Sequence, residues 1–256
     1  MMNFSGKSVV VTGAGGGIGR ASACLFAAHG AAVTVNDINA EAAAETVDLI
    51  LAQGGQGCAS VLDVGDEDEV RELVARHCER HGGLDVMFNN AGGSFPTPLL
   101  EIDSAEYRRL MALNFDAVYF GSRAALEVML RQGAGCILAT SSGAGLGAVE
   151  GLAVYGCAKA AVNALMRSIA TEYGRQGIRA NAISPGAMDT PGLRSWLETR
   201  PGGVKAYNDA QPSGRLGRSE EIAEAALWLA SDHASFINGA VLPVDGAVHA
   251  LLATPQ

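Results

Sequence analysis

Short apolar runs alternate along the chain with longer segments whose apolar residues recur at helical spacing. The first pair is "SVVVTG" (residues 8–13) and "IGRASACLFAAHG" (residues 18–30), and the last strand-like run, the seventh, is "GAVLPVDG" (residues 239–246). Short apolar runs bounded by glycine predict buried strands, and strands separated by helices predict a parallel sheet with helices on both faces. The sequence therefore predicts the α/β class and a doubly wound, seven-stranded parallel sheet.

Two features concern the organisation of the chain. No repeat or linker breaks the alternation, so residues 1–256 are expected to form a single domain, with residues 103–133 as one long helix that begins with the capping pair Asp103 and Glu106. The one long interruption covers residues 187–215. A loop of that length inside a compact domain is usually functional, so we expect a substrate-binding lid there.

Composition and charge exclude several classes of function. Hydrophobic residues make up 48% of the chain and charged residues 18%, which is enough apolar surface for a buried core. The net charge of −9 argues against a nucleic-acid or anionic-membrane partner. The five cysteines have neither CxxC nor metal-ligand spacing, so we expect free thiols and no metal site. No run resembles a signal peptide or a membrane span, which makes a soluble cytoplasmic protein the expectation.

The segment "TGAGGGIG" joins the first strand to the first helix and has the spacing Thr12-Gly13-x-x-x-Gly17-x-Gly19. Glycine permits positive φ and lets backbone amides approach a phosphate at a helix N-terminus, where the helix dipole favours an anion. A flexible turn is the alternative interpretation. The strand–loop–helix context favours a phosphate site and hence a dinucleotide cofactor.

Asp37 ends the second strand-like run. A carboxylate there can accept both hydrogen bonds of an adenosine ribose and repels a 2′-phosphate. Residues 31–70 and 13–19 contain neither Lys nor Arg, so a 2′-phosphate would lack its cation. These features predict NAD and disfavour NADP. Asp63, at the expected end of the third strand, is interpreted either as an acceptor for the adenine amino group or as the cap of a turn.

Six motifs follow one another along the chain: TGxxxGxG at residues 12–19, NNAG at 89–92, Ser142, Tyr155-x-x-x-Lys159, "PGAMDT" at 185–190 and the closing "FINGAVLPVDGA". Together they resemble the short-chain dehydrogenase/reductase family, in its single-domain Rossmann-fold form, over nearly the whole chain. The resemblance implies a catalytic tetrad of Ser142, Tyr155, Lys159 and Asn114. It also implies cofactor contacts from Gly13, Gly17, Ile18, Gly19, Asp37, Asp63, Val64, Asn90, Ala91, Gly92, Tyr155, Lys159, Pro185, Gly186 and Thr190.

Tyr155 and Lys159 stand four residues apart, so on a helix they share one face. A nearby ammonium stabilises a phenolate and lowers the pKa of the tyrosine, and bound NAD⁺ adds positive charge. A tyrosine shifted toward working pH is a competent general acid or base. In the chemistry that the resemblance implies, Tyr155 exchanges the substrate proton and Ser142 orients the substrate oxygen. Lys159 binds the nicotinamide ribose, Asn114 positions a water, and Thr190 holds the nicotinamide carboxamide.

Three segments are expected to wall the substrate beside Tyr155: residues 93–99, residues 143–152 and the lid. The substrate-binding candidates are Ser142, Tyr155, Phe95, Leu152, Met188 and Trp196, with Leu146 and Leu193 as further lining residues. Ordinary packing is the alternative for the apolar ones.

The leading hypothesis is an NAD-dependent dehydrogenase for a neutral, fairly apolar secondary alcohol that is cyclic, terpenoid or steroid-like. One alternative is a 3-oxoacyl-carrier-protein reductase, against which Asp37 and the acidic balance argue. The other is a non-catalytic NAD sensor, which would be expected to lose a catalytic residue. The resemblance also implies a homotetramer, with interfaces at about residues 106–131, 153–173 and 241–244. The C-terminal "AVHALLATPQ" is expected either to reach a neighbouring subunit's pocket or to fray.

Overall fold

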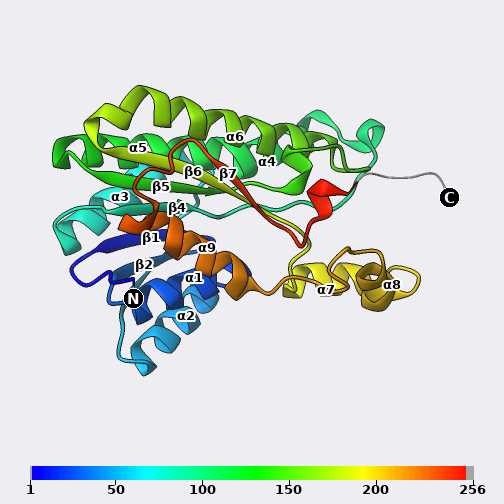
Figure 1. Cartoon of the computed structure of the whole chain (residues 1–256), viewed down its shortest axis with the longest axis horizontal. Coiled ribbons are helices and arrows are strands. Elements are labelled where there is room, and N and C mark those ends of the chain that lie inside the picture. The colour runs from blue at the N-terminus through cyan, green and yellow to red at the C-terminus, as the bar shows by residue number, and fades with distance from the viewer. Residues whose placement is uncertain (1, 252–256) are drawn as a thin grey trace.

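All seven expected strands lie in one parallel sheet in the computed structural model, which describes residues 2–251 (Figure 1). Across the sheet they lie in the order β3-β2-β1-β4-β5-β6-β7. Their bounds are Ser8–Thr12 (β1), Ala32–Asn36 (β2), Gln56–Ser60 (β3), Val86–Asn89 (β4), Gly135–Thr140 (β5), Ile178–Pro185 (β6) and Val241–Val244 (β7). The fold class expected from the alternation is confirmed.

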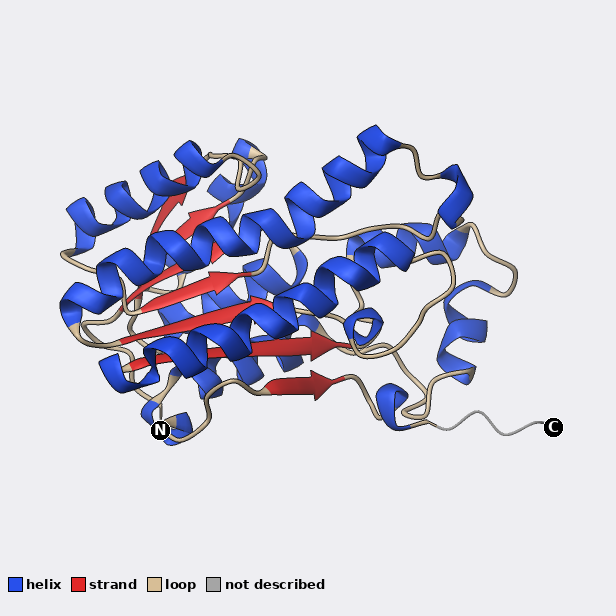
Figure 2. Cartoon of the chain, turned by 90° about the horizontal axis from the view of Figure 1, so that it is seen from above, coloured by secondary structure: helices blue, strands red, loops and turns tan. Residues whose placement is uncertain are grey.

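Helices cover both faces of the sheet (Figure 2). On one face lie α1 (Gly17–Ala28), α2 (Ala40–Ala52) and α9 (Ser219–Ala230), and on the other lie α3 (Glu67–His81), α5 (Ala117–Gln132) and α6 (Ala153–Tyr173). Each strand directs alternate side chains to the two layers. In β1, Val9 and Val11 join the first core, whereas Val10 joins the second. Because both faces are buried at the centre of the sheet, β1 carries a continuous apolar run, whereas the edge strand β3 (QGCAS) is polar and partly exposed.

The chain winds outward from β1 in both directions. β2 and β3 lie toward one edge of the sheet, and β4 to β7 lie toward the other. In open parallel sheets, ligands bind in the crevice outside the carboxyl ends of the strands where the order reverses. The loops after β1, β4 and β5 meet at that edge, and they carry the glycine loop, the NNAG motif and Ser142.

The helix expected at residues 103–133 is interrupted. It consists of α4 (Ser104–Met111), a π-helical turn at Ala112–Asp116 and then α5. Asp103 caps α4 as expected, since its side chain accepts from the backbone amides of Ala105 and Glu106 at 2.9 and 2.8 Å. The second half of the capping pair is wrong, because the Glu106 carboxylate is bound by Arg109 on the next turn.

Residues 187–215 contain two short helices, α7 (Pro191–Glu198) and α8 (Gly203–Asp209), which extend beyond the main body of the sheet (Figure 1). α7 begins at a recognisable signal, with Thr190 as N-cap and Pro191 at the first helical position. Backbone hydrogen bonds tie the two ends of the segment together: Asp189 donates to Gly217 (2.7 Å) and Gly217 to Ala187 (2.9 Å).

The remaining short helical turns are η1 (Leu99–Glu101), η3 (Gly143–Gly145), η4 (Gly174–Gln176), η5 (Asp232–Ala234) and η6 (Val248–Ala250). Within residues 2–251, no helix combines the length and the apolar character needed to cross a bilayer. The final five residues of the C-terminal segment, for which we expected a role at a neighbouring pocket or fraying, lie outside the described residues.

Candidate active site

The loop after β1 forms a tight cradle at the start of α1. Gly13 has φ +60°, and a Cβ on Gly19 would lie 2.1 Å from the Gly13 carbonyl oxygen. The N-cap residue of α1 is Gly16, which has no side chain to occupy the first amides of the helix. Gly17 and Ile18 are the first two residues of α1. The cradle therefore has the shape and the amide donors that a pyrophosphate needs.

Asp37 directly follows β2 and faces the glycine loop. Its Oδ2 accepts from the backbone amide of Gly15 at 2.8 Å, and its Oδ1 accepts from the amide of Asn39 at 2.9 Å. Each carboxylate oxygen has a second lone pair, so Asp37 can accept two further hydrogen bonds from vicinal hydroxyl groups.

The third strand is shorter than expected, which changes the position of Asp63. β3 ends at Ser60, so Asp63 lies in the loop after it, and its Oδ1 accepts from the amide of Gly65 at 2.8 Å. This contact matches the turn-capping interpretation that the sequence left open. Val64 is buried in the core beneath α3 and α5.

The NNAG segment is bonded to its neighbours through Asn90 and Thr12. Thr12 Oγ1 accepts from the amides of Asn90 (2.9 Å) and Ala91 (3.0 Å), and Asn90 Nδ2 donates to the Thr12 carbonyl (3.0 Å). Thr140 Oγ1 donates to Asn90 Oδ1 at 2.9 Å. Asn90 thus joins the ends of β1, β4 and β5, and holds the strand-end loop as the resemblance implies.

Lys159 and Tyr155 lie on the first turns of α6, with the ammonium 5.6 Å from the centre of the phenol ring. The Lys159 side chain is 1% exposed, and its Nζ donates to the carbonyl of Thr140 at 2.9 Å. Burial lowers the pKa of Lys159 to about 8. Because Nζ is anchored at the end of β5, the charge stays beside the tyrosine.

The direction of the Tyr155 pKa differs from the sequence expectation. Burial raises the pKa of the phenol above its usual value, and an interaction with the Ser142 side chain opposes that shift. The lowering expected from Lys159 is therefore not found: desolvation of the phenolate sets the direction, and Ser142 is the group that opposes it. Ser142 also accepts from the amide of Ala144 at 3.2 Å, so its hydroxyl is held at the start of η3.

Asn114 lies in the π-helical turn and is completely buried. Its Oδ1 accepts from the amide of Gly93 (2.9 Å), and its Nδ2 donates to the carbonyls of Gly93 (3.1 Å) and Leu110 (3.0 Å). A Cβ on Gly92 would lie 2.9 Å from Asn114 Oδ1 and 3.0 Å from Lys159 Nζ. The structure therefore brings Asn114, Lys159 and the NNAG loop together, with Asn114 holding the loop after β4.

Thr190 reaches the cofactor cradle from the other side. Its Cγ2 lies 3.3 Å from the position of a Cβ on Gly17, and its Oγ1 accepts from the amide of Leu193. Pro185 ends β6, and the amide of Gly186 donates to Val244 at 3.1 Å. The stem of the 187–215 segment thus lies against the glycine loop.

The candidate wall residues have different surroundings. Phe95 is 60% exposed, whereas Leu152 and Trp196 are partly buried, and Arg200 stacks 4.5 Å above the Trp196 ring. The amide of Thr97 donates to the carbonyl of Gly151 at 2.8 Å, so two of the expected wall segments touch. Met188 is 6% exposed and packs in the core against Gly217, which supports ordinary packing for that residue.

Sequence reasoning missed a cation close to Asp37. Arg20, in the first turn of α1, donates to the carbonyl of Gly15, whose amide is bound by Asp37. Arg20 directly follows residues 13–19, the stretch of the glycine loop that contains no cation. Its charge is shared with Glu45 of α2 at 2.8 Å. Buried Asn36 was also missed; its Nδ2 donates to the Ser60 and Leu62 carbonyls, joining β2 to the loop after β3.

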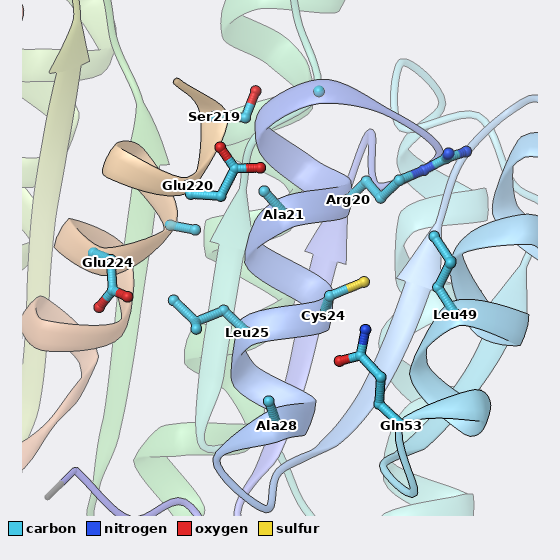
Figure 3. A pocket seen from close by; sticks show the side chains of 12 residues that line it. Arg20, Ala21, Cys24, Leu25, Ala28, Leu49, Gln53, Ser219, Glu220 and Glu224 are labelled. Atoms are coloured by element: carbon cyan, nitrogen blue, oxygen red, sulfur yellow. The ribbon is translucent and has the colours of Figure 1, made fainter. Parts of the chain in front are cut away.

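A hollow of about 480 Å³ lies elsewhere, on the outer face of α1 between α2 and α9 (Figure 3). Ala21, Leu25 and Ala28 line its centre, with Leu49 and Glu224 at its sides. None of the four candidate catalytic residues lines it.

A family model described as enoyl-(acyl carrier protein) reductase matches residues 13–249. The chain belongs to the short-chain dehydrogenase/reductase family. It is 39% identical over 253 residues to a 2,5-dichloro-2,5-cyclohexadiene-1,4-diol dehydrogenase of Sphingobium indicum, covering 98% of this chain and 100% of the relative.

Two solved structures are similar to this member of the short-chain dehydrogenase/reductase family over nearly all of both chains. Levodione reductase superposes with a TM-score of 0.94 at 33% identity, covering 98% of this chain and 100% of that one. A 7α-hydroxysteroid dehydrogenase complexed with NADH and 7-oxo glycochenodeoxycholic acid has a TM-score of 0.90 at 37% identity, covering 95% and 94%. The chain is therefore an oxidoreductase of the alcohol–ketone type in a family that binds nicotinamide cofactors.

Proposed function

We propose that this protein is an NAD-dependent dehydrogenase that interconverts a neutral, largely apolar cyclic secondary alcohol and its ketone. The observation that carries the proposal is the Lys159 ammonium, buried and anchored on Thr140 beside Tyr155, at the sheet edge that also holds the glycine loop. Burying an ammonium costs desolvation free energy, and such buried charges are concentrated at functional sites, where they stabilise a charge that develops in the reaction.

The residues around the crevice fit a dinucleotide. A Cβ on Gly19 would collide with the carbonyl oxygen of Gly13, and a Cβ on Gly92 would crowd Lys159, so the loops keep this shape only with glycine at both positions. Asp37 is oriented by two backbone amides and has lone pairs for both ribose hydroxyls. A carboxylate at that position repels a 2′-phosphate, and Arg20, which shares Gly15 with Asp37, is already paired with Glu45. These features support NAD over NADP.

A bound nicotinamide supplies the hydride chemistry. Tyr155 holds or removes the proton of the substrate oxygen, and Ser142 orients that oxygen. Since burial raises the pKa of Tyr155, the phenol depends on the Lys159 charge to act near neutral pH. With a pKa of about 8, Lys159 is mostly protonated at pH 7 and supplies that charge. Asn114 fixes the loop after β4, in which Gly92 lies beside the Lys159 ammonium.

The substrate class follows from the relatives and from the wall. Two of the three relatives named above are a cyclohexadiene-diol dehydrogenase and a hydroxysteroid dehydrogenase, and the substrates in both names are ring alcohols. Phe95, Leu152 and Trp196 offer apolar surface on the segments expected to face the substrate. Residues 187–215 serve as the lid, because their stem touches the glycine loop and two helices extend from it.

The test is NAD(P)H formation from a panel of cyclic secondary alcohols, with NAD⁺ and NADP⁺ in parallel. We expect turnover with NAD⁺ and a loss of at least about 100-fold in Tyr155→Phe, which lacks the acid–base hydroxyl. Asp37→Ala should weaken the binding of NAD⁺ and reduce the preference of the enzyme for NAD⁺ over NADP⁺. Preference for NADP⁺ in the wild type, or full activity in Tyr155→Phe, would refute the proposal.

Two further arms address the other functions. A 3-oxoacyl thioester offered with NADPH tests the 3-oxoacyl-carrier-protein reductase alternative. Binding of NADH without turnover of any ring alcohol would favour the sensor.

We also propose a homotetramer. Trp228 of α9 is partly exposed and Phe236, just after η5, is fully exposed, so each offers apolar surface to another subunit. Light scattering on the purified protein measures the mass of the oligomer directly, and the mass of a monomer would refute the proposed homotetramer.

A further inference from the structure

The glycine loop is held from outside by α2. Arg20 leaves the first turn of α1 and extends toward α2, away from α9 (Figure 3). Its Nη2 donates to the carbonyl of Gly15 and to Glu45 Oε2 (2.8 Å), and its Nε donates to Thr46 Oγ1 (3.0 Å). All of these acceptors belong to the glycine loop or to α2.

Thr46 provides the second contact, from inside the core. The residue is completely buried, and its Oγ1 lies 2.9 Å from the carbonyl oxygen of Ala14. The peptide group between Ala14 and Gly15 is therefore held at both ends, because its N–H is bound by Asp37 at 2.8 Å. Buried polar groups in folded proteins are hydrogen-bonded, so the buried hydroxyl of Thr46 has a fixed place in the packing beneath the loop.

The next peptide group is aimed by Arg20. In a trans peptide the C=O and the following N–H point in opposite directions. Since Arg20 draws the Gly15 carbonyl toward α2, the N–H of Gly16 faces the opposite side of the loop. A Cβ on Gly15 would lie 2.7 Å from Ala42 and 2.8 Å from Asp37, so the loop has little freedom to rotate.

We propose that Arg20 and Thr46 are positioning residues for the adenosine diphosphate half of the cofactor. Thr46 orients the peptide that holds Asp37 in place, and Arg20 orients the next amide toward the phosphates. This inference rests on the proposed dinucleotide function and adds two residues that act through the backbone of the glycine loop. Because the two side chains organise donors before the ligand arrives, their loss weakens binding without touching the chemical step.

The first experiment measures Kd for NADH and for ADP-ribose, together with kcat at saturating NAD⁺, in Arg20→Met. We expect both Kd values to rise about tenfold, as for the loss of a charge-assisted hydrogen bond, with kcat within about twofold of wild type. The matched control is Arg76→Met, which removes an exposed arginine paired with Glu72 on α3 and should change neither Kd nor kcat. If Arg20→Met fails to fold, Arg20→Lys replaces it, since lysine keeps the charge but cannot reach all the acceptors.

The second experiment is a double-mutant cycle between Thr46→Val and Asp37→Ala. If Thr46 acts by orienting the peptide bound to Asp37, the double variant should bind NADH only about as weakly as Asp37→Ala, and Thr46→Ser should restore wild-type Kd. Effects on Kd that multiply, or Kd values unchanged in folded Arg20→Met or Arg20→Lys, would overturn the inference. Wild-type protein that binds neither NADH nor NADPH would instead overturn the proposed function together with it.

Discussion

Acid should destabilise this protein through His77, on the inner side of α3. The imidazole is 2% exposed, and its Nδ1 lies 2.8 Å from Thr34 Oγ1. Burial lowers the pKa of His77 from 6.5 to about 4, with a smaller lowering from His81 and an opposing effect of Asp85. In the unfolded chain the ring binds a proton near pH 6.5, whereas in the folded chain it stays neutral down to about pH 4.

The sign and the size follow from this difference. Between those two pH values the unfolded state binds more protons, so the free energy of unfolding falls as the pH falls. The loss from this one group is about 2 kcal/mol at pH 5 and about 3 kcal/mol at pH 4, and above pH 6.5 it vanishes.

Urea unfolding at pH 7, 5 and 4 measures the effect against His77→Leu. The variant loses a contact to Thr34 and is expected to be less stable at pH 7. The free energy of unfolding of the variant should nevertheless fall less with acid. Between pH 7 and pH 4 it should lose about 3 kcal/mol less than the wild type, because the variant lacks the titrating group. Parallel pH profiles for the two proteins would refute the reasoning.

Three other substitutions test separate parts of the site. Gly19→Ala places a Cβ 2.1 Å from the Gly13 carbonyl oxygen, so the loop must move, and the Kd for NADH in a fluorescence titration should rise at least about tenfold. Asn114→Ala removes three buried hydrogen bonds and should lower the free energy of unfolding in urea by about 2–4 kcal/mol; an unchanged midpoint would contradict this. Leu197→Ala removes the one buried side chain of α7, so tryptic cleavage in the lid should be faster by about 30-fold or more, while a spectroscopic Tm stays nearly constant. Equal cleavage rates would show that Leu197 does not anchor the lid.

Much of the fold was predictable because its signals are local. A strand buried on both faces must be apolar along its length, and a helix must repeat its apolar residues every three to four positions. The cofactor loop is visible for the same reason, since Gly13 adopts a positive φ and Gly19 has no room for a Cβ. The element order and the place of the candidate site therefore follow from short stretches read independently of each other.

The errors arose where residues far apart in the sequence meet. Asn114 lies in a π-helical turn because its side chain is bonded to Gly93, 21 positions away. For Met188 the sequence left substrate contact and ordinary packing open, and its packing against Gly217 became visible only in the structure. Neither contact leaves a pattern within a window of ten or twenty residues.

The sequence by itself determined the α/β class, the strand count and the residues that meet at the carboxyl edge, because burial and glycine geometry act on neighbouring positions. Only the tertiary structure decided the burial, the hydrogen-bond partners and the pKa values of those residues. Lys159 stays buried because the carbonyl of Thr140, at the end of β5, accepts a hydrogen bond from its ammonium. Tyr155 has a raised pKa because the assembled site removes water from it. Arg20 is bound to α2 because the sheet order sets α1 beside α2. Desolvation and pairing depend on what the whole fold brings together, and no single segment encodes them.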